Sequence, residues 1–402
     1  MLARLLQTRN ILCTIFEAET SIDYRSQGGT LDLRTNTGLT AIREAGLWDT
    51  FQKFARYDGE SMLVTDKNLT TWMRRSPGKP GQKQKLQEAP EIDRSDLRKM
   101  LLESVPEESI RWGMKLTRVQ ETAAGHELHF ANGEVERRYD LIVGCDGAFS
   151  KTRSLLASEK PFYTGLSGWT MQIVNAEITA PNVDKLVNRG SVFAYSDGKS
   201  LTIQQLSSGN IWVSTYGAYK EDYVFTCGFD PKNIENVKTL LTKELDDWAP
   251  ELMEAVEKAQ GDATWRSLYM LPVGFTWPHK KGVTLLGDAA HLMTPFSGIG
   301  VNTAFYDAML LAEQIVDFTK STQPESLDDH VVAYETKMFE HAHKAQKHTE
   351  GSMNDMLFTP GAPRTSIESW ILRHMNADLP AWSHPFSTAV VYAGFWVYKW
   401  FV

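Results

Sequence analysis

The stretch LLGDAAHLMTPFSGIGVNTA, Leu285 to Ala304, decides which fold this sequence encodes. It begins in an apolar run, GVTLLGD, that is typical of a buried strand and stops at Asp288. Two glycines, Gly298 and Gly300, come just before a helix-like segment. A carboxylate at a strand's carboxyl end can accept hydrogen bonds from ribose hydroxyls, and a helix N-terminus attracts anions. The stretch therefore predicts part of a nucleotide site.

A second element of the same kind lies upstream, in DLIVGCDGAFSKTR, Asp140 to Arg153. Its hydrophobic strand runs into Asp146 and Gly147, and Ser150 and Arg153 lie on the next turn. Taken alone, each element also fits an ordinary strand, turn and helix cap. Two of them on either side of a long middle section favour a nucleotide-binding domain that is interrupted by an insertion.

The hydrophobic pattern supports this division. The chain opens with a helix feeding a strand that ends in acidic residues, CTIFEAE. Short alternating runs between about residues 160 and 275 predict an antiparallel sheet, with SSGN, Ser207 to Asn210, as one turn and a helical interruption over residues 233–259. Residues 304–319 and 327–358 are predicted to be helical. The fold class is therefore α/β with a β-rich insertion.

Charge and cysteine content exclude several function classes. The formal net charge of −8 argues against a general nucleic-acid binder, which needs a basic surface. The three cysteines lack the spacing of a disulfide framework or a zinc site, and HAHKAQKH, His341 to His348, is interpreted as a solvated helix face, so no metal is predicted. A secretory signal is absent from the N-terminal residues, which favours a cytoplasmic location. The apolar, aromatic segment from Phe386 to Val402 predicts either a docked terminal helix or contact with a membrane surface.

Four segments together resemble one known family. CDGAFSKTR and GDAAHLMTPFSGIGVN, with GGTLDL (residues 28–33) and DRSDLRKMLL (residues 93–102), are similar to motifs of the FAD-dependent aromatic hydroxylases of the p-hydroxybenzoate hydroxylase class. The similarity is greatest to the branch with the tetracycline-inactivating monooxygenases and fungal biosynthetic enzymes. It implies a Rossmann-like FAD domain of the glutathione-reductase type, an inserted antiparallel substrate sheet and C-terminal helices. The expected boundaries are 1–60, 91–158 and 276–320 for the FAD domain, 61–90 and 159–275 for the substrate domain, and 321–402 for the helical region.

The resemblance also implies roles for individual residues. Glu17 would bind the adenosine ribose, Arg98 the FAD chain and Asp288 the ribityl or pyrophosphate region. The flavin ring would lie near Pro295 and the backbone of Gly298, Gly300, Val301 and Asn302. FAD and NADPH would contact Arg25, Asp32, Asp146 and Arg153, and the substrate would contact Gln172.

The sequence departs from the family pattern at its start. The family begins with a strand and a GxGxxG loop that holds the FAD pyrophosphate, whereas MLARLLQTRNILCTIFEAE matches only the helix and strand after that loop. Two explanations stay open. Either residues precede this sequence in the natural protein, or the chain is a degenerate homologue.

The resulting hypothesis is an FAD-dependent monooxygenase. NADPH or NADH would act as a transient reductant, and one oxygen atom of O₂ would enter an aromatic or polyketide-like small molecule by hydroxylation or epoxidation, in secondary metabolism. The rival hypothesis is a non-redox homologue, a cyclase or binding protein that no longer holds FAD. The oligomeric state is left open.

Overall fold

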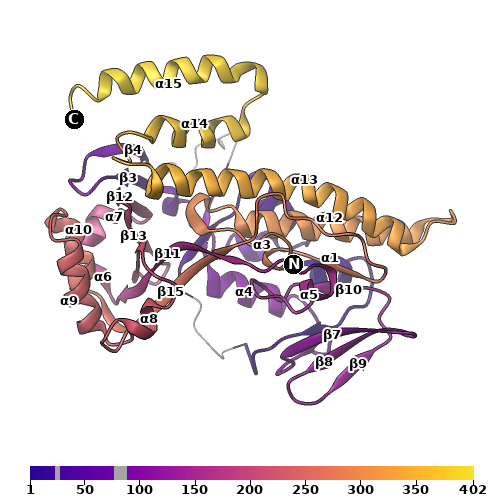
Figure 1. The fold of residues 1–402 in the computed structure, drawn as a ribbon. Coiled ribbons are helices and arrows are strands. Elements are labelled where there is room, and N and C mark those ends of the chain that lie inside the picture. The colour runs from indigo at the N-terminus through magenta and orange to yellow at the C-terminus, as the bar shows by residue number, and fades with distance from the viewer. Residues whose placement is uncertain (23–27, 77–87) are drawn as a thin grey trace. The chain divides into compact units, whose positions relative to one another are not determined.

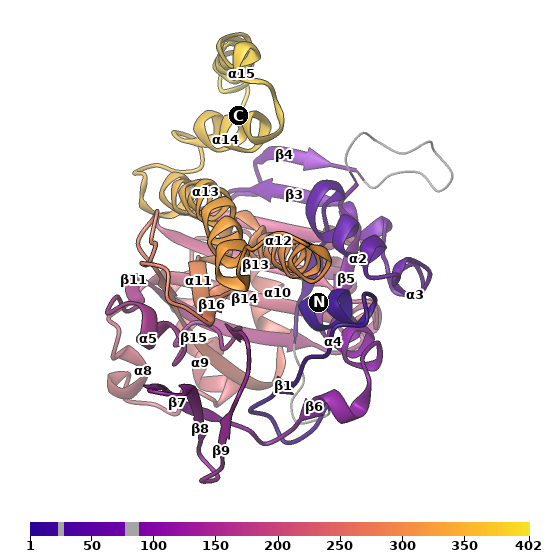
Figure 2. The ribbon, with the colours of Figure 1, turned by 90° about the vertical axis from the view of Figure 1, so that its right-hand side faces the viewer.

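The computed structural model describes residues 1–22, 28–76 and 88–402, and it confirms the predicted α/β fold. The chain divides into two compact units (Figures 1 and 2). The first consists of residues 1–55, 85–162 and 269–347, and the second of residues 56–84, 163–268 and 348–402. Residues 321–402, expected as one helical region, are thus shared between the units. Which unit serves the cofactor and which the substrate stays a prediction.

The first unit contains the two strand-to-Asp elements as neighbours. Strand β10 (Ile142–Gly144) pairs in parallel with β16 (Val283–Leu285), so that Ile142 lies opposite Val283. Strand β1 (Ile15–Phe16) pairs in parallel with β6 (Ile110–Arg111). All three residues of β16 are buried, as expected for a strand with apolar neighbours on both faces. The parallel pairing places the carboxyl ends of β10 and β16 at one edge.

The rest of the first unit surrounds these strands. Strands β2 (Thr30–Asp32) and β5 (Glu91–Asp93) form an antiparallel pair, and β7 (Leu116–Thr122), β8 (Gly125–Phe130) and β9 (Val135–Arg137) form an antiparallel sheet. The helices are α1 (Leu2–Gln7), α2 (Thr40–Glu44), α3 (Trp48–Phe51), α4 (Arg94–Glu103), α5 (Arg153–Leu156), α11 (Asp288–His291), α12 (Gly300–Lys320) and most of α13 (Leu327–Met353). Their buried apolar side chains make one core with β10 and β16.

The second unit is built on a seven-stranded sheet in the order β15-β11-β14-β13-β12-β3-β4. The strands are β3 (Met62–Thr65), β4 (Thr71–Arg75), β11 (Phe162–Ile173), β12 (Ser191–Ser196), β13 (Lys199–Gln205), β14 (Ile211–Ala218) and β15 (Gln260–Met270). The predicted turn at residues 207–210 does connect β13 to β14. The antiparallel sheet predicted between about residues 160 and 275 is confirmed, since β11 pairs with β14, β12 with β13, and β13 with β14 in antiparallel orientation. The sheet also extends beyond these residues, where β12 pairs in parallel with β3.

Helices cover one face of this sheet. They are α6 (Ala176–Thr179), α7 (Pro181–Val187), α8 (Tyr223–Thr226), α9 (Ile234–Glu244) and α10 (Pro250–Glu257). The single helical stretch predicted over residues 233–259 is therefore two helices. Pro250 is the first residue of α10, where its missing N–H costs nothing, and it could not continue α9. Leu201, Ile203 and Val213 of the sheet pack with Leu241 and Val256 of these helices.

The second unit ends in helices α14 (Ile367–Asp378) and α15 (His384–Tyr398), which lie side by side (Figures 1 and 2). The side chain of Tyr398 donates to the carbonyl oxygen of Thr71 at 2.5 Å, and Lys399 pairs with Glu368 at 2.6 Å. The prediction of a docked terminal helix agrees with these contacts. In the described part of the chain, no helix combines the length and apolarity needed to cross a membrane.

Candidate flavin site

The glycine-rich turn before α12 presents open backbone, as the sequence predicts. Pro295 begins a short 3-10 turn, and Gly298 has a φ of +66°, which an L side chain rarely adopts. Both residues are exposed. A Cβ atom added to Gly300, the first residue of α12, would have no neighbour within 4 Å. Because the first N–H groups of a helix have no acceptor inside it, this 21-residue helix offers unpaired donors and a positive dipole end here.

Asn302 fixes this helix start to strand β2. Its Oδ1 accepts hydrogen bonds from the backbone N–H of Arg34 at 2.8 Å and of Gly38 at 3.2 Å, and its Nδ2 donates to the Asp32 carbonyl at 2.8 Å. The hydrogen-bonding groups of the Asn302 side chain are therefore all engaged within the protein, and only the backbone of Asn302 is available to a ligand. A Cβ at Gly38 would lie 2.6 Å from Asn302 Oδ1, so glycine is required there by packing.

Arg34 is a residue that the sequence patterns did not single out. Its Nε donates to Asp32 Oδ2 at 2.9 Å, and its Nη2 donates to the Ser297 carbonyl at 3.1 Å. The pair therefore joins β2 to the glycine turn and keeps Asp32 Oδ1 beside Gly298, where an added Cβ would be 3.3 Å away. The sequence signal is weak, because one Arg after LDL is more often simply solvated.

Asp288 lies at the end of β16 with its carboxylate available. It makes no hydrogen bond or ion pair with the described residues, and it keeps an accessible surface. Enough protein surrounds it that desolvation raises the pKa of its carboxyl, with His291 and Arg94 opposing that effect. Asp288 is therefore well suited to bind hydroxyl groups of a ligand, as its predicted role requires.

Asp146 and Arg153 hold the second motif together. Asp146 accepts from the Ser150 hydroxyl at 2.5 Å and from the Lys151 N–H at 2.7 Å. The Arg153 guanidinium is buried and donates to the carbonyl oxygens of Ala148 and Ala289, the latter at 2.9 Å. Arg153 thus links the two motifs to each other, and a direct ligand contact for either residue stays a prediction.

Glu17 and Arg98 line one cavity, of about 280 Å³, together with Leu31, Arg94, Leu97, Leu101 and Leu102. Arg98 donates to Glu19 Oε2 and to the Ile22 carbonyl, both at 2.5 Å, and Glu17 Oε1 accepts from the Glu19 N–H at 3.0 Å. Two arginines, a carboxylate and leucines make a cavity suited to a phosphorylated nucleoside. Glu19, which orders Arg98, was not predicted.

The other predicted site residues lie elsewhere. Gln172 is on β11 of the second unit, and Arg25 lies outside the described residues. His341 is half-buried, with its ring centroid 4.4 Å from that of Tyr306, and burial lowers its pKa. The interpretation of residues 341–348 as a wholly solvated face was therefore wrong, because α13 packs this side chain against α12. No cluster of three or more potential metal ligands occurs in residues 1–22, 28–76 and 88–402.

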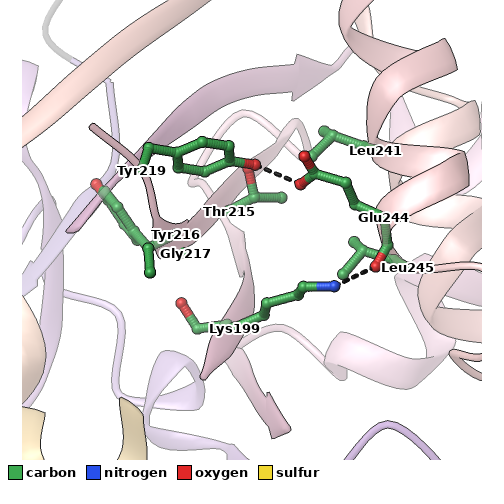
Figure 3. Close-up of a pocket in the computed structure, with 10 residues that line it drawn as sticks. Lys199, Thr215, Tyr216, Gly217, Tyr219, Leu241, Glu244 and Leu245 are labelled. Atoms are coloured by element: carbon green, nitrogen blue, oxygen red, sulfur yellow. Dashed lines mark hydrogen bonds between the residues drawn. The ribbon is translucent and has the colours of Figure 1, made fainter. Parts of the chain in front are cut away.

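A further cavity, of about 220 Å³, lies in the second unit, between β13, β14 and α9. Figure 3 shows Tyr219 directed at the Glu244 carboxylate and Lys199 at the Glu244 carbonyl. Burial, followed by Glu244, raises the pKa of Tyr219, so its hydroxyl stays protonated and donates. Since these polar groups bind one another, we assign no ligand to this cavity.

Comparison with known proteins identifies the family. The model of the FAD binding domain family matches residues 1–349. The chain belongs to this family. It is 32% identical over 370 residues to the monooxygenase penA of Penicillium thymicola, which covers 80% of this chain and 83% of that protein. It is 30% identical over 332 residues to the monooxygenase asqM of Emericella nidulans, covering 71% and 73%. The resemblance predicted from the motifs is confirmed.

Solved structures agree at the level of the fold. The structure of Klebsiella pneumoniae HpxO complexed with FAD and uric acid has a TM-score of 0.72 with 17% identity, and covers 97% of this chain and 93% of that one. CtdE in complex with FAD and a substrate has a TM-score of 0.73 with 15% identity, covering 98% and 95%. The family and these relatives make the chain an FAD-dependent monooxygenase, and the non-redox alternative finds no support among them.

The first unit fits FAD on its own geometry. The open space at Gly300, the unpaired carboxylate of Asp288 and the arginine-lined cavity at Glu17 are three complementary features of one unit. They match a ring with a polar edge, a polyhydroxyl chain and a phosphorylated nucleoside, respectively. The flavin supplies the redox chemistry of O₂ activation, with NAD(P)H as the reductant typical of the family, while the chain supplies donors, dipoles and shape.

Proposed function

We propose that this monooxygenase recognises a planar aromatic or conjugated small molecule through a row of three side chains on the sheet of the second unit, Gln172, Trp212 and Gln204. We call these residues the amide–indole row. Hydroxylation and epoxidation are both compatible with it. The observation that carries the proposal is the register of β11, β14 and β13, which places two carboxamides on either side of one indole.

The register puts the three side chains on one face. Gln172 lies opposite Trp212, and Trp212 lies opposite Gln204. Neighbouring positions in these strands, such as Met171, Ile203 and Val213, are buried in the core shared with the helices. Because side chains alternate along a strand, the amide–indole row is on the face opposite that core.

The row has unused hydrogen-bonding capacity. Neither the Gln172 carboxamide nor the Trp212 indole N–H has a hydrogen-bond partner in the described part of the chain, and Gln204 makes only a long contact of 3.4 Å with Ser191. All three residues are half-buried. An indole face with amides beside it suits a flat ring that carries carbonyl or N–H groups at its edge.

The names of other relatives support this substrate class. They include a 6-hydroxynicotinate 3-monooxygenase, an FAD-dependent urate hydroxylase and a kynurenine 3-monooxygenase, at 23–28% identity. Each of these names describes a small molecule with an aromatic or conjugated ring system. We extend the same class to this chain, including polyketide-like aromatic compounds.

Residues of the first unit would hold FAD. The backbone from Gly298 to Asn302 would meet the flavin ring, Asp288 the polyhydroxyl chain, and Glu17 with Arg98 the adenosine portion. The positive end of α12 favours negative charge on a group held there. Asp32, Asp146, Arg153 and Arg25 are assigned to the surroundings of FAD and the passing NADPH or NADH.

A spectrum and a substrate panel test the proposal. The purified chain supplied with FAD should show flavin absorption, and planar heteroaromatic compounds should stimulate NAD(P)H oxidation with formation of oxygenated product. Gln172→Leu and Trp212→Leu should raise KM at least tenfold with FAD content unchanged. The matched control Asn182→Ala, on the helix-covered side, should leave KM unchanged. Equal KM values in all variants would exclude the amide–indole row, and a protein without flavin would contradict the cofactor assignment.

We also propose that α15 contacts a membrane surface. Its outward side chains are unusually apolar for an exposed helix, and no acidic residue follows Asp378 in the sequence. On α15 the most exposed large side chains are Phe386 (75%) and Trp396 (65%), and Trp382 (83%), Trp400 (74%) and Phe401 (82%) lie just before and after the helix. Trp and Tyr favour the interface between water and lipid, and an apolar helix face of this kind lies in that plane.

Sedimentation with phosphatidylcholine vesicles tests this second candidate. The protein should pellet with the vesicles, and Trp396→Ser combined with Trp400→Ser should release it, whereas Phe225→Ser, at another exposed aromatic residue, should not. Failure to pellet, or a dimer in size-exclusion chromatography that the double variant dissociates, would exclude membrane contact in favour of self-association.

A further inference from the structure

A buried ion pair lies directly behind the turn at Gly287, which joins β16 to α11. His291, at the end of α11, is 1% exposed, and Asp307, in the third turn of α12, is fully buried. His291 Nε2 and Asp307 Oδ2 are 2.6 Å apart. Burying two ionisable groups is costly for a fold, and apolar residues of similar size often do as well or better. The pair therefore needs a reason beyond stability.

Asp307 also holds the backbone of the turn. The N–H of Gly287 donates to the same Oδ2 atom at 3.1 Å. Gly287 has a φ of +63°, and a Cβ added there would lie 3.3 Å from the Ala304 Cβ of α12. The strand therefore turns into α11 through a conformation that favours glycine, and α12 clamps this turn from behind. Asp288, the residue with the available carboxylate, follows Gly287 directly.

Helix α12 carries both the backbone amides that are predicted to contact FAD and the Asp307 carboxylate that holds the Gly287 turn. The N-terminal amides of α12, at Gly300, are the groups proposed to meet the flavin, and Asp307 lies two turns further along. Because a helix is rigid over this length, the clamp fixes the position of Asp288 relative to those amides. Arg153 supports the turn from the other motif through the Ala289 carbonyl.

Charges around the pair favour the imidazolium. Burial alone disfavours it, but the attraction of Asp307, followed by that of Asp288, outweighs burial and raises the pKa of His291. The charge of His291 also contributes, after burial, to lowering the pKa of His341 of α13. Asp307 Oδ1 and His291 Nδ1 have no hydrogen-bond partner among the described residues, which is a further cost of keeping the pair buried.

We propose that His291 and Asp307 are positioning residues for FAD: the pair clamps the Gly287 turn and thereby sets Asp288 against the start of α12. Neither side chain touches the cofactor. The imidazole N–H orients the carboxylate, and the carboxylate holds the Gly287 amide. Loss of either side chain should make the Gly287 turn more mobile while the rest of the domain stays folded.

The test compares four variants of the full chain. His291→Leu removes the donor to Asp307, whereas His291→Gln can replace it, so His291→Leu should raise the FAD dissociation constant at least tenfold and His291→Gln less than threefold. Asp307→Asn should also weaken binding. The control is Glu335→Gln, which alters a second His–carboxylate contact of the same unit, between the buried Glu335 and the exposed His279, without touching Gly287. It should leave the FAD dissociation constant within twofold of wild type.

Two readouts separate positioning from general destabilisation. Hydrogen exchange of the peptide covering residues 285–295 should accelerate in Asp307→Asn and His291→Leu, with or without FAD, and not in Glu335→Gln. The visible spectrum of bound flavin should change in the same two variants. If His291→Leu fails to fold, the comparison of Asp307→Asn, which keeps the size of the side chain, with Glu335→Gln decides. Slow exchange in Asp307→Asn, or equal loss of FAD from Glu335→Gln, would overturn the proposal.

Discussion

The Asn302 side chain donates to the carbonyl oxygen of Asp32 at 2.8 Å and thereby joins the first turn of α12 to strand β2, 270 residues apart in the sequence. The same side chain accepts from the N–H groups of Arg34 and Gly38. The start of the helix is consequently held in place before any ligand binds.

Removing this side chain should destabilise the first unit. Asn302→Ala leaves two buried N–H groups without an acceptor, and we expect a loss of about 2–4 kcal/mol in the free energy of unfolding. Urea denaturation measures it. The control Asn132→Ala, at an exposed position of the same unit, should cost no more than about 1 kcal/mol. A loss of that small size in Asn302→Ala would show that the network is not stabilising.

Two glycines should respond in opposite ways to the same substitution. Gly300→Ala meets open space and should leave thermal stability unchanged or slightly higher, because Gly is unfavourable in helices by roughly 0.5–1 kcal/mol. If FAD approaches this backbone, the same variant should bind FAD at least several-fold more weakly. Gly144→Ala would place its Cβ 2.6 Å from Thr152 Cβ and should lower the stability directly. Unchanged FAD affinity in Gly300→Ala would move the flavin ring away from α12.

A substitution in the arginine-lined cavity should show whether the charge of Glu17, and not only the size of its side chain, contributes to FAD binding. Glu17→Gln keeps the size of the side chain but removes a charged acceptor, and we expect FAD affinity to fall by about tenfold, which corresponds to about 1.4 kcal/mol. Fluorescence titration with FAD measures the effect. Glu44→Gln, at an exposed position of the same unit, provides the matched control. Identical dissociation constants for both variants would argue against a ribose contact at Glu17.

The stability of the first unit should depend on the protonation of His291. Its pKa is raised in the folded state, so the stabilisation is fully present below the ordinary imidazole value of about 6.5 and is lost as pH rises through the folded-state pKa. The groups facing it are Asp307, Asp288 and His341. The free energy of unfolding of wild type relative to His291→Gln should therefore decrease from pH 6 to alkaline pH. A constant difference across that range would show that the pKa of His291 is the same in the folded and unfolded states, and would contradict the prediction.

The sequence determined the class of the fold and the location of its motifs. Apolar runs that stop at Asp288 and Asp146 are local patterns, and strand-to-helix turns with glycine depend on backbone sterics that act over a few residues. For the same reason the hairpin at residues 207–210 could be predicted. The division of residues 233–259 into two helices also has a local cause, because Pro250 can begin a helix but cannot continue one.

Tertiary structure alone decided which polar groups are used up and which are available. The sequence suggests that Asn302 and Arg153 contact a ligand. In the folded chain their side chains instead form hydrogen bonds with carbonyl and N–H groups of distant segments, whereas the Asp288 carboxylate has no such partner among the described residues. Tertiary structure likewise decided the parallel pairing of β12 with β3 and the amide–indole row. It also decided which charged side chains pair: Arg98 with Glu19, Asp32 with Arg34 and His291 with Asp307. A buried polar group forms hydrogen bonds with the groups that the fold places next to it, and the spacing of residues in the sequence does not show which groups these are.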